Sequence, residues 1–129
     1  MPATLYAHDI DPRQKLLDAV GDLDGIEVWH NQVICAIYVA PERTKGGIIR
    51  PQSNVDEDRY QGKVGLIIKM GPQAFRSDAK WQWPDDLAEQ DWVYYRASDG
   101  FACRINGVDC RILEDVDVKG RAQHPDKVW

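Results

Sequence analysis

Residues 41–64 have the sequence PERTKGGIIRPQSNVDEDRYQGKV, a polar and turn-rich stretch between two apolar, strand-like runs at 33–39 and 64–68. Loops longer than about 12–15 residues are uncommon in compact domains and are usually functional or disordered. This loop carries an isolated aliphatic pair, Ile48 and Ile49, directly after two glycines. The pair is suited to a groove on another protein. Alternatively, the loop folds back and its isoleucines cap the domain's own core.

The C-terminal half predicts antiparallel strands. Residues 92–95 and 101–105 are strand-like runs separated by a turn at 98–100, and Asn106-Gly107 joins the second run to 108–113. Asn-Gly between apolar runs is the strongest short-range signal for a β-hairpin. Residues 115–118 are expected to add a final edge strand.

These runs predict a mostly β fold, a small antiparallel β-barrel of five to seven strands whose alternate side chains fill the interior. The expected core consists of the aliphatic side chains of Val33, Ile37, Val64, Leu66, Ile68, Val93, Ile105 and Ile112.

The first 27 residues predict an extension with one short helix at about 11–20. Asp11 is suited to the N-cap and Pro12 to the first helical position, and Gly21 ends the pattern. Leu16 and Leu17 belong to a short apolar stripe. Because a helix of about ten residues is marginal alone, this stripe must pack on the barrel or on a neighbouring subunit.

Residues 72–89 form an aromatic excursion between two strands. Trp81 and Trp83 alternate with Gln82 as in an edge strand, and Phe75 and Leu87 add apolar surface. Tryptophans are enriched at interaction hot spots, but they also close the open end of small barrels. The tail, residues 119–129, ends in Val128-Trp129. Trp129 is expected to anchor on another surface or to tuck against the chain's own barrel.

Several segments resemble segments of the GroES-type co-chaperonin family (chaperonin-10-like), and they follow one another in the same order as in that family. The resemblance is greatest to the GroES-like proteins that phages encode. The resemblance covers about residues 28–118. The segments that carry it are 45–49 (KGGII), 61–64 (QGKV), 70–71 (MG), 90–95 (QDWVYY), 99–100 (DG) and 105–113 (INGVDCRIL).

The resemblance implies a GroES-like antiparallel β-barrel with a long loop of the mobile type at 41–62. It implies a sevenfold ring of subunits whose loops dock on a ring-shaped chaperonin, which handles the nucleotide. The residues that match the docking motif are Gly46, Gly47, Ile48 and Ile49, and the 72–89 excursion takes the place of the hairpin that roofs the dome.

Arg50 departs from the family pattern, because the third docking position there is aliphatic. Losing one buried aliphatic side chain forfeits about 1.5–3 kcal/mol of transfer free energy. A charged replacement adds a desolvation cost unless Arg50 meets a carboxylate or stays at the rim. Several loops acting together on a ring would offset this loss through avidity.

Composition narrows the classes of partner. A chain of 129 residues with a net charge of −5 fits one small domain and argues against nucleic-acid or anionic-membrane binding. No apolar stretch is long enough to span a bilayer, and residues 1–4 do not begin a signal peptide, so we expect a cytoplasmic protein.

No catalytic or metal-binding pattern stands out, and we expect neither an enzyme nor a cofactor. The three histidines lie far apart in sequence, without metal-ligand spacing. Cys35, Cys103 and Cys110 lie in strand-like runs and are expected to be free thiols in a reducing cytosol, although Cys103 and Cys110 could face each other across the hairpin.

Two functions follow. The first is a phage or prophage co-chaperonin, a homo-oligomer that docks on a chaperonin ring through Gly46, Gly47, Ile48, Ile49 and Arg50 and assists capsid-protein folding in the host cytoplasm. The second is a virion structural protein that retains the barrel and decorates the major capsid protein. Arg50 favours decoration. Further interface residues are expected at Leu16, Leu17, Trp81, Trp83 and Trp129.

Overall fold

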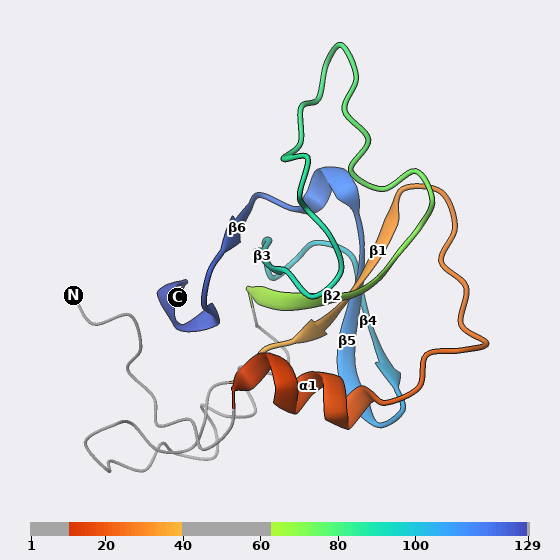
Figure 1. The fold of residues 1–129 in the computed structure, drawn as a ribbon, viewed down its shortest axis with the longest axis vertical. Helices are drawn as coiled ribbons and strands as arrows, with labels where there is room; N and C mark the ends of the chain where they lie inside the picture. The colour runs from red at the N-terminus through yellow and green to blue at the C-terminus, as the bar shows by residue number, and fades with distance from the viewer. Residues whose placement is uncertain (1–10, 40–62, 129) are drawn as a thin grey trace.

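The computed structural model describes residues 11–39 and 63–128, which form one α-helix and six strands (Figure 1). The elements are, in chain order, α1 (Pro12–Val20), β1 (Gln32–Ile37), β2 (Val64–Met70), β3 (Trp92–Tyr94), β4 (Phe101–Ile105), β5 (Val108–Glu114), the 3-10 turn η1 (Asp115–Asp117), β6 (Gly120–Ala122) and the 3-10 turn η2 (Pro125–Lys127).

The strands form a single antiparallel sheet in the order β4-β5-β1-β2-β3-β6. The expected antiparallel β fold with one short helix is therefore confirmed. The expected closure is not seen in the described strands, because β4 and β6 lie at opposite edges of the order. Closure is not needed to bury the apolar side chains, since other segments cover both faces of the central strands.

Alternate residues of the central strands enter two separate cores. The helix-side cluster consists of Val20, Ile34, Ala36, Val64, Leu66, Ile68, Trp92 and Cys110. The excursion-side cluster consists of Val33, Cys35, Ile67, Val93, Tyr95, Leu113 and Val118. Apolar side chains therefore point to both faces of β1 and β2, which explains the near-continuous apolar runs in the sequence.

This two-sided arrangement corrects the expectation of one interior. Val64, Leu66 and Ile68 belong to one cluster, whereas Val33 and Val93 belong to the other. Ile37 is buried, while Ile105 and Ile112 are only partly buried at the border of the helix-side cluster.

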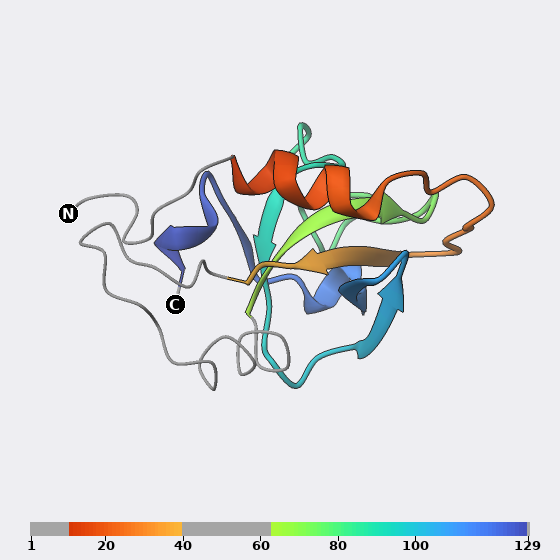
Figure 2. The ribbon, with the colours of Figure 1, turned by 90° about the horizontal axis from the view of Figure 1, so that it is seen from below.

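Helix α1 forms where its capping residues predict. The Asp11 carboxylate accepts from the Arg13 backbone N–H, and Gly21, at φ +61°, donates to the Leu17 carbonyl and ends the helix. The helix packs against β2 and β5, and Figure 2 shows it lying along the sheet. Asn106 at the hairpin turn donates to the carbonyls of Val20 and Asp22, which joins the β4–β5 hairpin to the end of α1.

The aromatic excursion between β2 and β3 projects from the sheet as a long loop, at the top of Figure 1. The predicted edge strand at 81–83 is wrong, because these residues have no regular secondary structure and follow a bend at 79–80. The Asp78 carboxylate accepts from the backbone N–H groups of Lys80 and Trp81, which satisfies donors that a strand ladder would otherwise use. Phe75 and Leu87 pack against the excursion-side cluster.

Residues 115–117 form η1 instead of the predicted edge strand, and the last strand is β6. Side chains of Glu114 and Asp117 form a reciprocal capping box that starts the turn. Among the described residues, no helix has the length and apolarity that crossing a membrane requires.

Candidate functional site

The two ends of the long loop leave the sheet side by side. Tyr38 donates its backbone N–H to the Val64 carbonyl at 3.0 Å, one step beyond the Ile37–Gly65 pair of the β1–β2 ladder. The described residues therefore include the loop base, which we define as Tyr38 and Val64. The predicted docking residues, Gly46 to Arg50, lie outside the described residues.

The C-terminal segment supports the loop base. The Tyr38 ring contacts the buried Trp92 edge-on, with 5.7 Å between ring centroids. The Tyr38 hydroxyl donates to the carboxylate of Asp126, which is only 4% exposed, and the Asp126 backbone N–H donates to Nδ1 of His124. The hydrogen bond satisfies the partly buried Tyr38 hydroxyl and joins the segment after β1 to η2. Sequence reasoning missed this contact because its two residues are 88 positions apart.

Three aromatic side chains of the excursion form a stack. Trp83 is half-buried and packs edge-on against Phe75 at 5.1 Å, and Trp81 stacks on Trp83 at 6.4 Å with 19° between the planes. Trp81 is 45% exposed. The stack begins at the excursion-side cluster and ends in solvent. It therefore combines the two roles that the sequence left open, because its inner end covers the core and its outer end exposes an aromatic surface.

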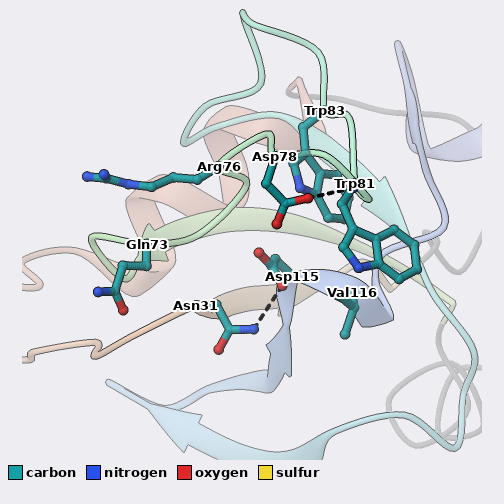
Figure 3. Close-up of a pocket in the computed structure, with 8 residues that line it drawn as sticks. All are labelled: Asn31, Gln73, Arg76, Asp78, Trp81, Trp83, Asp115 and Val116. Carbon is teal, nitrogen blue, oxygen red and sulfur yellow. Dashed lines mark hydrogen bonds between the residues drawn. The ribbon is translucent and has the colours of Figure 1, made fainter.

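A pocket of about 270 Å³ lies beside this stack (Figure 3). Its lining includes Trp81, Trp83 and the carboxylates of Asp78 and Asp115. The hydrogen bonds from the backbone N–H groups of Trp81 and Lys80 favour the ionised carboxylate and lower the pKa of Asp78. Sequence reasoning did not find Asp115, because it comes from the start of η1 rather than from the excursion.

The remaining predicted interface residues are distributed elsewhere. Leu16 and Leu17 are half-buried and pack against the helix-side cluster of their own chain. Trp129 lies outside the described residues. Two further exposed aromatic residues, Trp29 at 65% and Phe101 at 59%, were not singled out from the sequence. In the part of the chain that the structure describes, no three His, Cys, Asp or Glu side chains are grouped to hold a metal ion.

Comparison with known proteins identifies the domain. The family described as "Chaperonin 10 Kd subunit" matches residues 25–122, which include the whole sheet and both ends of the long loop. The chain belongs to the chaperonin 10 kDa subunit family. The match does not include α1 or η2. Both nevertheless contact the matched domain: Val20 of α1 packs in the helix-side cluster, and Asp126 of η2 accepts a hydrogen bond from Tyr38.

Individual relatives agree with the family match. The chain is similar to "Co-chaperonin GroES" of Methylocella silvestris, 32% identical over 91 residues, and to "Co-chaperonin GroES" of Hyphomonas neptunium, 30% identical over 91 residues. Each comparison covers 70% of this chain and 90% of the relative. It is also 30% identical to "Co-chaperonin GroES 1" of Rhizobium meliloti, over 70% of this chain and 88% of the relative.

Proposed function

We propose that this member of the chaperonin 10 kDa subunit family is a co-chaperonin encoded by a phage or prophage. In this proposal a homo-oligomeric ring docks on a chaperonin ring through the 41–62 loops and assists the folding of capsid protein in the host cytoplasm. Gly46 and Gly47 shape the docking segment, Ile48 and Ile49 fill an apolar groove on the chaperonin, and Arg50 lies at its rim.

The observation that carries the proposal is the loop base within the family match. Tyr38 and Val64 are hydrogen-bonded neighbours at one end of the sheet, so both ends of the loop start from one fixed place. Tyr38 is held further by Trp92 and Asp126. A loop that starts from a rigid scaffold presents its binding residues from a defined position, as interaction loops commonly do.

The test is association with a bacterial chaperonin ring and nucleotide, measured by sedimentation and by the mass of complexes separated by size exclusion. Replacing both Ile48 and Ile49 with serine should weaken docking by several kcal/mol and leave unfolding within about 0.5 kcal/mol of wild type. If the double variant unfolds readily instead, the isoleucines belong to the core of their own chain.

Arg50 supports the alternative, a virion structural protein that decorates the major capsid protein. Arg50→Leu should tighten chaperonin docking by up to about 1.5–3 kcal/mol per loop if the chain is a co-chaperonin. In a decoration protein Arg50 would pair with a carboxylate on the capsid or an adjacent subunit. The same variant would then lose particle binding, most visibly at low salt, where the pair is least screened. Absence of chaperonin binding by either form favours the virion.

A further inference from the structure

The pocket beside the tryptophan stack has the size of a site for one side chain. Its volume is about 270 Å³, below the range of roughly 300–1,000 Å³ that small-molecule sites occupy. Three segments build it. The excursion supplies Asp78, Trp81 and Trp83, the start of η1 supplies Asp115, and the residue before β1 supplies Asn31. Figure 3 shows the carboxyl groups of Asp78 and Asp115 turned toward the same space.

Asp115 is a nearly buried carboxylate that is bound only by neutral groups. It is 7% exposed, and its oxygens accept from Nδ2 of Asn31 at 2.9 Å and from the Phe75 backbone N–H at 3.1 Å. No lysine or arginine among the described residues lies within ion-pair distance of Asp115 or Asp78, although the charge of Lys80 acts on Asp78 from farther away and helps to lower its pKa. Arg76 also lines the pocket, but its Nε donates to the Pro72 carbonyl and Figure 3 shows its side chain extending away from both carboxylates.

Such a carboxylate favours a cation nearby. Removing a carboxylate from water is costly unless hydrogen bonds or a positive charge compensate it, and a cation in this pocket would lie near Asp115 as well as near the exposed Asp78. The aromatic wall suits the same ligand, because the face of an indole ring attracts cations. The ammonium of Lys80 lies 5.5 Å from the centroid of the Trp81 ring. Lys80 does not line the pocket, but its position shows that this indole ring already has a cation over it.

We propose that this pocket binds an arginine side chain presented by another polypeptide. A guanidinium is planar and can stack on an indole ring while its N–H groups donate to carboxylates, which a lysine ammonium cannot do with equal directionality. The pocket lies on the excursion, and the chaperonin-docking motif lies on the 41–62 loop. Arginine binding therefore stands whether or not the loop docks on a chaperonin.

The probe is the peptide acetyl-Gly-Gly-Arg-Gly-Gly-amide, titrated into ¹⁵N-labelled protein while the indole N–H and side-chain amide signals are followed by NMR. The control peptide carries citrulline, which has nearly the shape of arginine without its charge. We expect the arginine peptide to shift the indole signals of Trp81 and Trp83 and the side-chain amide of Asn31. Its Kd should be at least tenfold lower than that of the citrulline peptide, and it should rise with salt.

Three variants test the assignment, and a fourth controls for net charge. Asp78→Asn and Trp81→Ala change exposed residues, so both should remain folded, and each should weaken arginine binding at least fivefold. Asp85→Asn removes the same charge from an exposed residue of the excursion outside the pocket lining and should bind as wild type does. Asp115→Asn should weaken binding most, provided that its spectrum shows a folded protein.

Three results would overturn the proposal. Equal affinity for the arginine and citrulline peptides would mean that charge is not recognised. Shifts confined to residues away from Trp81, Trp83 and Asn31 would place the binding elsewhere. Equal loss of affinity in Asp78→Asn and Asp85→Asn would reduce the effect to the general attraction of an acidic protein for a basic peptide.

Discussion

Cys103 on β4 lies directly opposite Cys110 on β5, and both are free thiols. The sequence left open whether they face each other across the hairpin, and the strand register shows that they do. Burial raises the pKa of Cys103 and raises that of Cys110 to about 12, so neither is a thiolate near neutral pH. Because attack on an oxidant or an alkylating agent requires a thiolate, the pair is poorly disposed to form a disulfide.

Alkylation of the native protein should therefore be slow and ordered. Cys103 is half-buried, whereas Cys35 and Cys110 are fully buried, so iodoacetamide at pH 8 should modify Cys103 first. Mass spectrometry of digests taken over time measures the order. A Cys103→Ser variant should lose the early modification, and equal early labelling of all three cysteines would contradict this packing.

The buried thiols also predict a loss of stability at alkaline pH. The pKa of Cys110 rises from its ordinary value of 9.0 to about 12 on folding, chiefly through burial, and burial raises the pKa of Cys35 as well. Above pH 9 the unfolded chain releases these protons and the folded chain retains them. The contribution of these two thiols to the free energy of unfolding should thus be constant below about pH 9 and fall between about pH 9 and 12.

Urea unfolding at successive pH values measures this fall. Cys110→Ala should shift stability at pH 7 through lost packing, but it should make the decline above pH 9 shallower than in wild type. An unchanged slope would show that Cys110 does not contribute to the titration.

The contact between Asn106 and the end of α1 should be measurable on its own. Asn106 has φ +51°, and its Nδ2 donates to the carbonyls of Val20 and Asp22. Asn106→Gly keeps the turn, because glycine adopts positive φ freely, but removes both hydrogen bonds. We expect a loss of about 1–2 kcal/mol in the free energy of unfolding.

Asn106→Ala is the matched comparison, because it adds the cost of positive φ to the loss of the same bonds. It should be less stable than the glycine variant in urea titrations. If the glycine variant were as stable as wild type, the two side-chain bonds would add nothing to the attachment of α1.

The bond between Tyr38 and Asp126 should contribute to stability through the burial of its acceptor. Tyr38→Phe keeps the ring on Trp92 but removes a donor from a carboxylate that is 4% exposed. Weakening the hydrogen bonding of a buried charged group costs about 1–3 kcal/mol. Thermal unfolding measures the loss, and Tyr94→Phe, in the half-buried position at the end of β3, serves as the control for removing a hydroxyl.

The local signals in the sequence predicted the local structure. Asn106-Gly107 forms the β4–β5 turn with both residues at positive φ, and Asp11, Pro12 and Gly21 delimit α1. These signals work because each depends on the backbone preferences of one or two neighbouring residues. The alternation of Trp81 and Trp83 is typical of a strand and hid the bend after Asp78. The bend forms because the Asp78 carboxylate accepts hydrogen bonds from the backbone N–H groups two and three residues later.

Contacts between distant segments could not be predicted in the same way. The division of β1 and β2 side chains between two clusters depends on what covers each face, which a strand pattern does not specify. Asp115 in the pocket and Asp126 beside the loop base have no local sequence signal that would single them out. Only the fold brings Asp115 beside Trp81 and Asp126 against Tyr38.

The position of η2 has a practical consequence for experiments on the long loop. Because Asp126 binds Tyr38, residues close to the C-terminal end of the chain lie beside the point where the loop leaves the sheet. If the loop docks as proposed, an affinity tag or fusion partner attached at that end would crowd the approaching partner and weaken docking. A small fluorophore attached there would instead report the proposed docking by a change in its surroundings, so the size of the label would decide whether this end of the chain obstructs docking or detects it.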